Sequence, residues 1–166
     1  MSWAVPNPEA IAALVEFVGA RDLLEIGAGL GLWARLIANE GVHITATDIN
    51  KDRATWFKPW SRPFFPIAPL GHLEALKTYP NHQTLMLCWP PYSEPMAAEA
   101  LDQFTGEQFI FIGEGEGGCT ATDKLWEILG ERFDLVKEVD IPQWAGIHDR
   151  MIFYSRRVTV SERIRV

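Results

Sequence analysis

Cysteine, positive charge and long apolar runs are all scarce in this sequence. The two cysteines, Cys88 and Cys119, do not have the spacing of a metal-binding pair. We therefore expect reduced thiols, as in a cytoplasmic protein, and no metal site. No apolar run approaches the length needed to cross a bilayer and no signal peptide is recognisable, so we expect no membrane partner. The formal net charge of −7 argues against a general affinity for nucleic acid.

The composition is otherwise that of an ordinary globular protein. Hydrophobic residues make up 48% and charged residues 22% of the 166 residues, which is enough for a sizeable core. There is no internal repeat and no low-complexity segment. We expect one domain over residues 1–166, with its core over 7–156 and a tail over 157–166.

A glycine-rich turn follows the first strong strand pattern. The run Leu23–Ile26 is apolar except at Glu25 and fits a buried strand of a parallel sheet. Gly27, Gly29 and Gly31 then remove three Cβ atoms from one turn, so a ligand can approach the backbone closely. Two interpretations remain open, a ligand-binding turn and a plain connection between a strand and the helix that follows.

The glycine spacing distinguishes two classes of nucleotide site. The dinucleotide fingerprint has glycines at its first, third and sixth positions, whereas the sixth position counted from Gly27 is Leu32. This disfavours a nicotinamide-dependent oxidoreductase. The Glu-x-Gly-x-Gly-x-Gly pattern that begins at Glu25 resembles motif I of class I, Rossmann-like methyltransferases that depend on S-adenosylmethionine (SAM). The resemblance implies that the turn passes under the methionine part of SAM, and that Glu25 fixes the turn or the cofactor's amino group.

An acidic residue ends the second predicted strand, residues 43–47. Asp48 follows directly, and ligands bind beyond the carboxyl ends of strands in a doubly wound sheet. A carboxylate there can accept hydrogen bonds from both hydroxyl groups of a ribose. Its separation from Gly31 is close to the roughly 20 residues expected of such an acid. The alternative is that Asp48 only caps a following helix.

The stretch 51–83 is the least interpretable part of the sequence, because its prolines forbid a continuous helix. We expect a third strand near 64–68. The methyltransferase family usually has an acid soon after this strand, near the adenine amino group, but here none follows and His72 is the candidate for the adenine contact. The full set of expected SAM-binding residues is Glu25, Gly27, Ala28, Gly29, Gly31, Asp48, Ile49, His72 and Trp89.

The strand pattern at 84–89 runs into Pro90, Pro91 and Tyr92, so the chain must leave the sheet there. This turn resembles the Pro-Pro-Tyr part of motif IV in amino methyltransferases, in which backbone carbonyls face the target amino group and an aromatic ring stacks on it. That family has Asn, Asp or Ser before the prolines, whereas Trp89 can only donate a hydrogen bond. Trp89, Pro90, Pro91 and Tyr92 form the expected catalytic set. The alternative is a rigid strand exit with no chemistry.

Two later segments carry further candidates. The glycine-rich loop 113–120 contains Glu114 and Glu116, which could take a proton or bind a cation, although solvated loop charges are the favoured interpretation. The strand patterns at 133–139 and 151–155 have no helix between them and must pair antiparallel. Their link contains Trp144, His148 and Asp149, which could reach the substrate side. For His148 a structural role is favoured over a catalytic one.

These patterns together predict an α/β three-layer sandwich, with a doubly wound, mostly parallel seven-stranded sheet and an antiparallel C-terminal hairpin. The resemblance implies a SAM-dependent methyltransferase that acts on a small-molecule, protein or nucleic-acid nucleophile, with nitrogen weakly favoured. The acidic charge favours a small-molecule or protein substrate. The alternative function is a non-catalytic SAM-binding module or a subunit of a larger methyltransferase complex.

Overall fold

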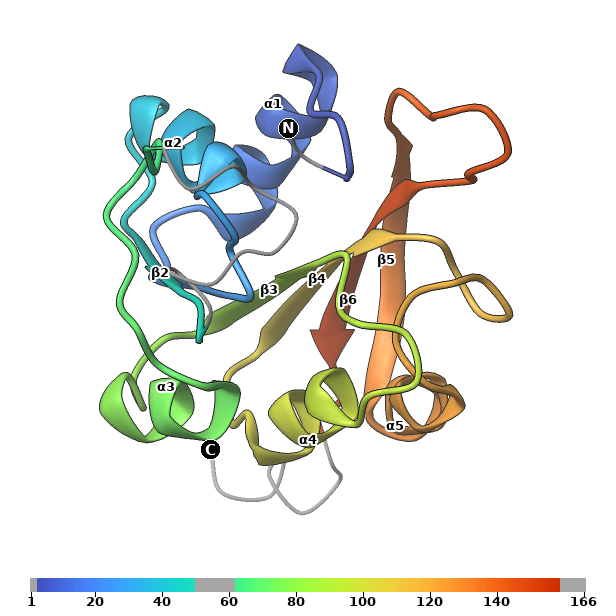
Figure 1. The fold of residues 1–166 in the computed structure, drawn as a ribbon. Coiled ribbons are helices and arrows are strands. Elements are labelled where there is room, and N and C mark those ends of the chain that lie inside the picture. Colours follow the sequence, from blue (N-terminus) through green and yellow to red (C-terminus); the bar gives the residue numbers. More distant parts are fainter. Residues whose placement is uncertain (1–2, 50–61, 159–166) are drawn as a thin grey trace.

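Helices and strands alternate along most of the chain, and two strands follow the last helix. The computed structural model describes residues 3–49 and 62–158 (Figure 1). In chain order the elements are α1 (Pro8–Val18), β1 (Leu23–Ile26), α2 (Leu32–Asn39), β2 (Ile44–Thr47), α3 (His72–Thr78), β3 (Thr84–Cys88), α4 (Met96–Gln103), β4 (Gln108–Gly113), α5 (Asp123–Arg132), β5 (Phe133–Asp140) and β6 (Arg150–Arg156).

The strands form one six-stranded sheet in the order β2-β1-β3-β4-β6-β5. Neighbours among β2, β1, β3 and β4 are parallel, whereas β6 pairs antiparallel with β4 and β5 pairs antiparallel with β6. The predicted class is therefore confirmed, including the C-terminal hairpin on a mostly parallel sheet. From β1 the chain first adds β2 on one side and then returns to add β3 on the other side. The point where the strand order reverses therefore lies between β1 and β3.

Helices cover both faces of the sheet, with α1 and α2 on one side and α3, α4 and α5 on the other (Figure 1). The strands supply apolar side chains to both faces, as buried parallel strands must. On β3, Met86 packs on the side of α1 and α2, whereas Leu85 and Leu87 pack on the opposite side. This alternation builds two cores, one on each face.

The expected third strand near 64–68 does not form, so the sheet has six strands within the described residues and not the predicted seven. The segment makes only one parallel bridge, between Thr47 and Ala68. Proline at 63, 66 and 69 removes backbone N–H donors that a ladder needs. The Phe64 N–H donates to the Leu30 carbonyl, at 2.8 Å, and not to a strand.

Two further expectations can be compared with the described residues. In residues 3–49 and 62–158, no helix has both the length and the apolar character to cross a membrane. Of the expected tail over 157–166, only 157 and 158 are described.

The segment 64–67 packs closely over the glycine turn at Gly31. A Cβ atom built on Gly31 would lie 2.8 Å from Ile67 Cδ1 and 2.9 Å from Phe65 Cβ. Gly31 also has φ +72°, a left-handed conformation that favours glycine. Both the space and the backbone therefore require glycine here.

Gly31→Ala is expected to reduce the free energy of unfolding more than Gly41→Ala does. Gly41 has φ +88° but nothing within 4 Å of a built Cβ, so its replacement adds only backbone strain, about 1–2 kcal/mol. The alanine at position 31 adds overpacking, typically about 1–3 kcal/mol. Urea denaturation of the two variants measures the difference. Equal losses would contradict the close packing of 64–67 on the turn.

Candidate functional site

The glycine turn after β1 is fixed to the end of β2 by backbone hydrogen bonds. The N–H groups of Gly27 and Ala28 both donate to the Thr47 carbonyl, at 2.9 and 3.0 Å. Gly27, Gly29 and Gly31 have φ of 75°, 57° and 72°, so each adopts a conformation that other residues rarely take. The glycine pattern in the sequence thus has a direct conformational cause.

Asp48 holds the same turn from the side. Its Oδ2 atom accepts a hydrogen bond from the Gly29 N–H at 2.9 Å, so this carboxylate connects the ends of β1 and β2. Ile49 follows and is exposed. Gly71, just before α3, lies beside it, because a Cβ built there would be 3.6 Å from Ile49 Cδ1.

His72, the predicted adenine contact, is engaged in a side-chain pair. Its Nε2 atom lies 2.8 Å from Oε2 of Glu99 on α4. The ring therefore connects α3 to α4.

Glu25 is an ionisable group buried in the core. Its side chain is only 1% exposed, and its Oε2 atom has no hydrogen-bond partner within the described residues. Burial, with a further contribution from the charge of Asp48, raises the pKa of Glu25 to about 8, although the Ala34 N–H donates to this carboxyl group and lowers the value. An unpartnered carboxyl oxygen in the core is costly unless a ligand group completes it.

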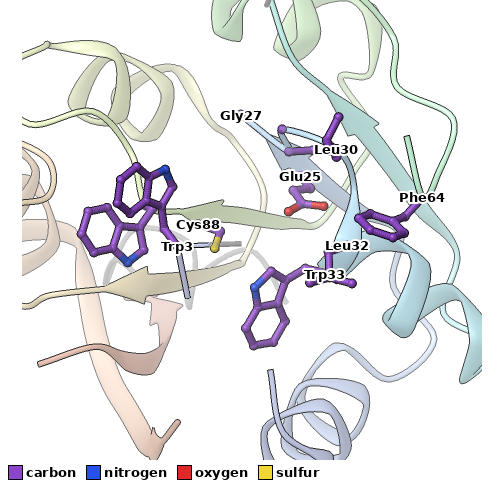
Figure 2. Close-up of a pocket in the computed structure, with 11 residues that line it drawn as sticks. Trp3, Glu25, Gly27, Leu30, Leu32, Trp33, Phe64 and Cys88 are labelled. Carbon is purple, nitrogen blue, oxygen red and sulfur yellow. The ribbon is translucent and has the colours of Figure 1, made fainter. Parts of the chain in front are cut away.

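Glu25 is one of the residues that line a pocket of about 60 Å³ beside the glycine turn. Figure 2 shows the Glu25 carboxyl group among the side chains of Cys88, Leu32 and Trp33. The lining residues are Trp3, Glu25, Gly27, Ala28, Gly29, Leu30, Leu32, Trp33, Phe64, Cys88 and Trp89. The pocket thus collects five of the nine residues expected to bind SAM. Gly31, Asp48, Ile49 and His72 do not line it.

Trp89 begins the turn after β3 and makes several fixed contacts. It has φ 52°, rare for a residue with a side chain, and its backbone N–H donates to the Ile112 carbonyl at 2.8 Å. Its indole Nε1–H donates to Asp149 Oδ1 at 2.9 Å. The ring stacks on Trp3, with centroids 5.2 Å apart and planes 19° apart. As the sequence indicated, the indole acts only as a donor.

The rest of the expected catalytic set lies beyond Trp89. Pro90 is buried, and its carbonyl accepts a hydrogen bond from the Ala121 N–H at 3.2 Å. Pro91 and Tyr92 are exposed, with Tyr92 64% accessible. The turn therefore presents an aromatic ring to solvent, while the Pro90 carbonyl already has a partner.

Glu114 is not a solvated loop charge, so the favoured interpretation of the sequence is wrong for this residue. Its Oε2 atom accepts from the Cys119 N–H and its Oε1 atom from the His148 N–H, both at 2.9 Å. Hydrogen bonds from Cys119 and His148 lower the pKa of Glu114 to about 2. Glu116, in contrast, is exposed.

Asp149 lies in the link between β5 and β6 and contacts Trp89, a pairing that the sequence did not predict. It is fully buried, its Oδ2 atom has no partner within the described residues, and burial raises its pKa. The available signal was indirect: Trp89 needs an acceptor for its indole N–H when it is partly buried. Nothing local in the sequence indicates that the acceptor lies sixty residues away.

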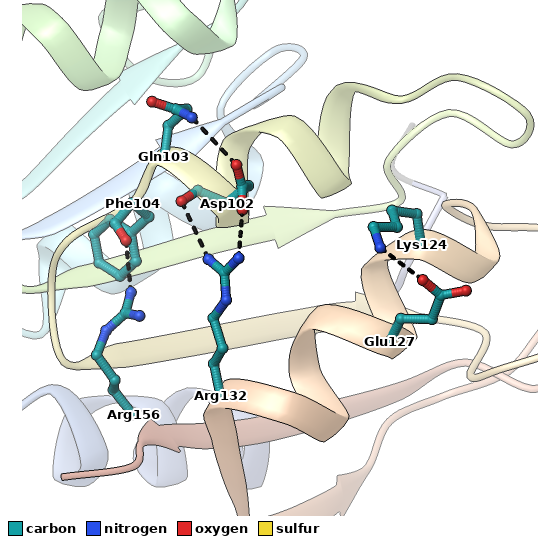
Figure 3. Close-up of polar contacts among 7 residues, drawn as sticks. All are labelled: Asp102, Gln103, Phe104, Lys124, Glu127, Arg132 and Arg156. Carbon is teal, nitrogen blue, oxygen red and sulfur yellow. Dashed lines mark hydrogen bonds and ion pairs between the residues drawn. The ribbon is translucent and has the colours of Figure 1, made fainter. Parts of the chain in front are cut away.

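Asp102, on the outer helix α4, is a surface carboxylate with a charged partner, unlike the buried Glu25 and Asp149. Figure 3 shows Asp102 of α4 facing Arg132 of α5, with Arg132 Nη2 2.7 Å from Asp102 Oδ1. The hydrogen bond from Arg132 holds the pKa of Asp102 below its ordinary value. Paired surface acids of this kind connect elements, whereas Glu25 and Asp149 are buried with an unpaired oxygen. Within the described residues, no group of three or more His, Cys, Asp or Glu is arranged to hold a metal.

No protein-family model and no curated protein matches this chain. Solved structures do share its fold. A 1,6-didemethyltoxoflavin-N1-methyltransferase from Burkholderia thailandensis, with bound 1,6-didemethyltoxoflavin and S-adenosylhomocysteine, has a TM-score of 0.62 and 18% identity, covering 91% of this chain and 78% of its own.

Two other solved structures are similar. The N-methyltransferase NodS from Bradyrhizobium japonicum, in complex with S-adenosylhomocysteine, has a TM-score of 0.59 and 16% identity, covering 92% of this chain and 89% of its own. A magnesium protoporphyrin IX methyltransferase from Synechocystis with bound SAM has a TM-score of 0.58 and 13% identity, covering 90% of this chain and 77% of its own. These likenesses show a class I methyltransferase fold.

Glu25→Gln is expected to change how stability depends on pH. The folded state keeps the Glu25 proton up to about pH 8, whereas the unfolded chain loses it near the ordinary value of 4.5. Folding therefore takes up a proton at pH values between about 4.5 and 8. In this range Glu25 lowers the free energy of unfolding as the pH rises, by at most about 1.4 kcal/mol per pH unit. The glutamine variant removes that part of the slope.

Urea denaturation at several pH values between about 5 and 8 measures this slope. Glu40→Gln, at an exposed acid after α2, is the matched control and should leave the slope unchanged. Curves of stability against pH that run parallel for wild type and Glu25→Gln would show that Glu25 does not titrate in this range.

Proposed function

We propose that this chain binds SAM at the glycine turn and transfers its methyl group to an acceptor. The single observation that carries the proposal is the buried, unpartnered Oε2 atom of Glu25 in the pocket beside that turn. A cationic amino group, such as that of the methionine part of SAM, would complete it. The SAM and S-adenosylhomocysteine in structures of the same fold support this choice of ligand.

The residues on the two strand ends suit the parts of SAM. Gly27 and Gly29 leave the backbone open to the methionine portion, and Glu25 would hold its amino group. Asp48, at the end of the neighbouring strand β2, would accept hydrogen bonds from the ribose. It would keep the hydrogen bond that it accepts from the Gly29 N–H. When bound, SAM supplies a methyl group made electrophilic by the positive sulfur to which it is attached. The chain's part is then mainly to align donor and acceptor.

The pocket at the glycine turn is smaller than the whole cofactor. Its volume of about 60 Å³ fits the amino-acid end of SAM, whereas complete small-molecule sites span about 300–1,000 Å³. Trp3 and Phe64 line the pocket from segments outside the sheet. Displacement of these two side chains is the change that would widen the site for the nucleoside.

The acceptor class follows less directly from the site. The methyltransferases of the same fold named above act on varied substrates, so fold does not select one. The Pro-Pro-Tyr turn favours a nitrogen acceptor by its resemblance to amino methyltransferases. Because the Pro90 carbonyl already accepts from Ala121, it has only one lone pair left for an amino group.

A second candidate, a SAM-binding module without transferase activity, is favoured by the Trp3–Trp89 stack. The indole of Trp3 covers the turn next to which a methyl acceptor would lie. The distinguishing measurement is methyl transfer from labelled SAM to fractions of a cell extract, beside a binding assay. SAM binding with no labelled product in any fraction would favour the second candidate.

SAM binding is expected to release about one proton at pH 7. The carboxyl of Glu25, with its pKa near 8, is mostly protonated there and must ionise to hold a cationic amino group. Calorimetry in buffers of different ionisation enthalpy measures the released protons, and Glu25→Gln should abolish the release. Tight binding of NAD without binding of SAM would refute the proposal.

Asp48→Asn is expected to weaken SAM binding by about 1.5–3 kcal/mol, the range for a charged hydrogen bond. Asparagine keeps an oxygen that can accept from the Gly29 N–H, so the turn should stay in place and stability should change little. Unchanged SAM affinity in this variant would remove Asp48 from the cofactor site.

A further inference from the structure

A second, larger hollow lies next to the Trp89–Tyr92 turn. This depression is open to solvent and spans about 660 Å³, within the range of small-molecule sites and far above the roughly 60 Å³ of the pocket at the glycine turn. Its lining residues are Tyr92, Glu114, Gly115, Glu116, Gly117, Gly118, Cys119 and His148. They come from the turn after β3, the loop after β4 and the link between β5 and β6.

Glu114 organises this depression. Its carboxylate accepts from the N–H groups of Cys119 and His148, and its own carbonyl accepts from the Thr120 hydroxyl at 2.7 Å. A Cβ atom at Gly118 would overlap Glu114, so the loop closes tightly around this side chain. The loop and the link are therefore held together by one ionised group at 8% exposure.

His148 is oriented by the same carboxylate. Its Nδ1 atom lies 3.5 Å from Glu114 Oε1, and its side chain is 79% exposed. This distance is longer than a fully formed hydrogen bond, and such contacts in sites without a ligand are often long. Because Nδ1 faces the carboxylate, Nε2 is on the other edge of the ring, and within the described residues it makes no hydrogen bond or ion pair.

We propose that this depression binds the methyl acceptor, and that His148, positioned by Glu114, takes the acceptor's proton through Nε2. The acceptor role rests on the proposed function, whereas the binding site and the orientation of the ring do not. A histidine whose second nitrogen faces a carboxylate is the usual arrangement of a general base.

A base has a defined part in methyl transfer to a neutral hydroxyl or amine. The acceptor's oxygen or nitrogen forms a bond to the methyl carbon, and the bond from that carbon to sulfur breaks, with its electron pair staying on sulfur. The acceptor's proton is released in the same overall reaction, and Nε2 of His148 receives it. Charge balances, because the positive charge lost at sulfur reappears on the imidazolium.

The lining indicates the chemistry of the acceptor. Tyr92 offers an exposed ring on which a planar compound can stack. The ionisable groups that line the depression are Tyr92, Glu114, Glu116, Cys119 and His148, with no lysine or arginine among them. This disfavours anions. We therefore infer a planar, neutral or cationic compound with a hydroxyl or amino group.

The two hollows are adjacent along the backbone. Trp89 lines the pocket at the glycine turn, and Tyr92, three residues later, lines the depression. A donor in the first site and an acceptor in the second would thus meet across the turn after β3, at the carboxyl edge of the sheet where ligands bind in such folds.

The first test reads the tautomer of His148 by nitrogen-15 NMR of the ring, without any ligand. In the wild type the neutral ring should carry its proton on Nδ1, facing Glu114, and Glu114→Gln should shift the proton to Nε2. His43 is the matched internal control, because its Nδ1 lies 2.8 Å from Asp22 Oδ1 in another part of the fold. Glu114→Gln should leave His43 unchanged, whereas Asp22→Asn should change His43 alone.

A His148 ring with its proton on Nε2 in the wild type, or one unaffected by Glu114→Gln, would overturn the positioning role. Because Glu114→Gln also alters loop contacts, the amide spectrum of the sheet residues checks that the variant is folded. If the variant does not fold, the wild-type tautomer still decides the outcome.

The second test uses naphthol as the probe, with naphthoate as its anionic counterpart. Naphthol should shift the amide signals of Tyr92, the 115–118 loop, Cys119 and His148, and naphthoate should bind at least tenfold more weakly. Tyr92→Ala should weaken naphthol binding about tenfold, whereas Tyr92→Phe, which keeps the ring, should not. Shifts elsewhere only, or equal binding to Tyr92→Ala, would overturn the acceptor site.

The acceptor site and the proposed function fail independently. Neither NMR test uses SAM, so loss of SAM binding leaves both tests intact. Conversely, SAM binding with proton release, together with no naphthol shifts at the depression, would leave the cofactor proposal standing and refute the acceptor site alone.

Discussion

The carboxyl group of Glu25, buried in the middle of a parallel sheet with one oxygen unpartnered, is the constraint on which the site depends. Strands covered on both faces leave no route to water for a polar side chain, so such a group carries a large desolvation penalty. Here it keeps its proton near neutrality and relies on the Ala34 N–H at the start of the next helix. The fold thus retains, at some loss of stability, a buried carboxyl group with one oxygen unpartnered within the described residues. Strained or unsatisfied groups of this kind are typical of functional sites.

The topology explains why the unusual groups gather at one edge. Because β2 and β3 flank β1, the chain winds in opposite directions from the first strand, and their carboxyl ends leave a crevice between the connections. The glycine turn, Asp48 and Trp89 all follow directly on these three strands. The antiparallel β6 then brings Asp149 from the far end of the chain to the indole of Trp89. Paired carboxylates such as Asp102 lie on the outer helices and have ordinary structural roles.

Local patterns predicted the parts of the fold that local chemistry determines. The apolar run before Gly27, the acid after the second strand and the absence of a helix between the last two strands each have a nearby physical cause, and the structure has all three features. The strand expected near 64–68 failed because prolines compete with ladder formation, and the segment instead covers Gly31. The partners of Glu114 and Asp149 were out of reach, because the pairs form between segments that only the folded sheet brings together. No periodicity or spacing records such contacts.

The stack of Trp3 on Trp89 places two fluorescent side chains in direct contact. The segment that carries Trp3 is also held by Trp144, whose Nε1–H donates to the Trp3 backbone carbonyl at 2.9 Å. Trp3 and Trp89 both line the pocket beside the glycine turn. Displacement of Trp3 from Trp89 would separate the stacked rings and change their contact with solvent. The indole fluorescence of these two residues would report such a displacement.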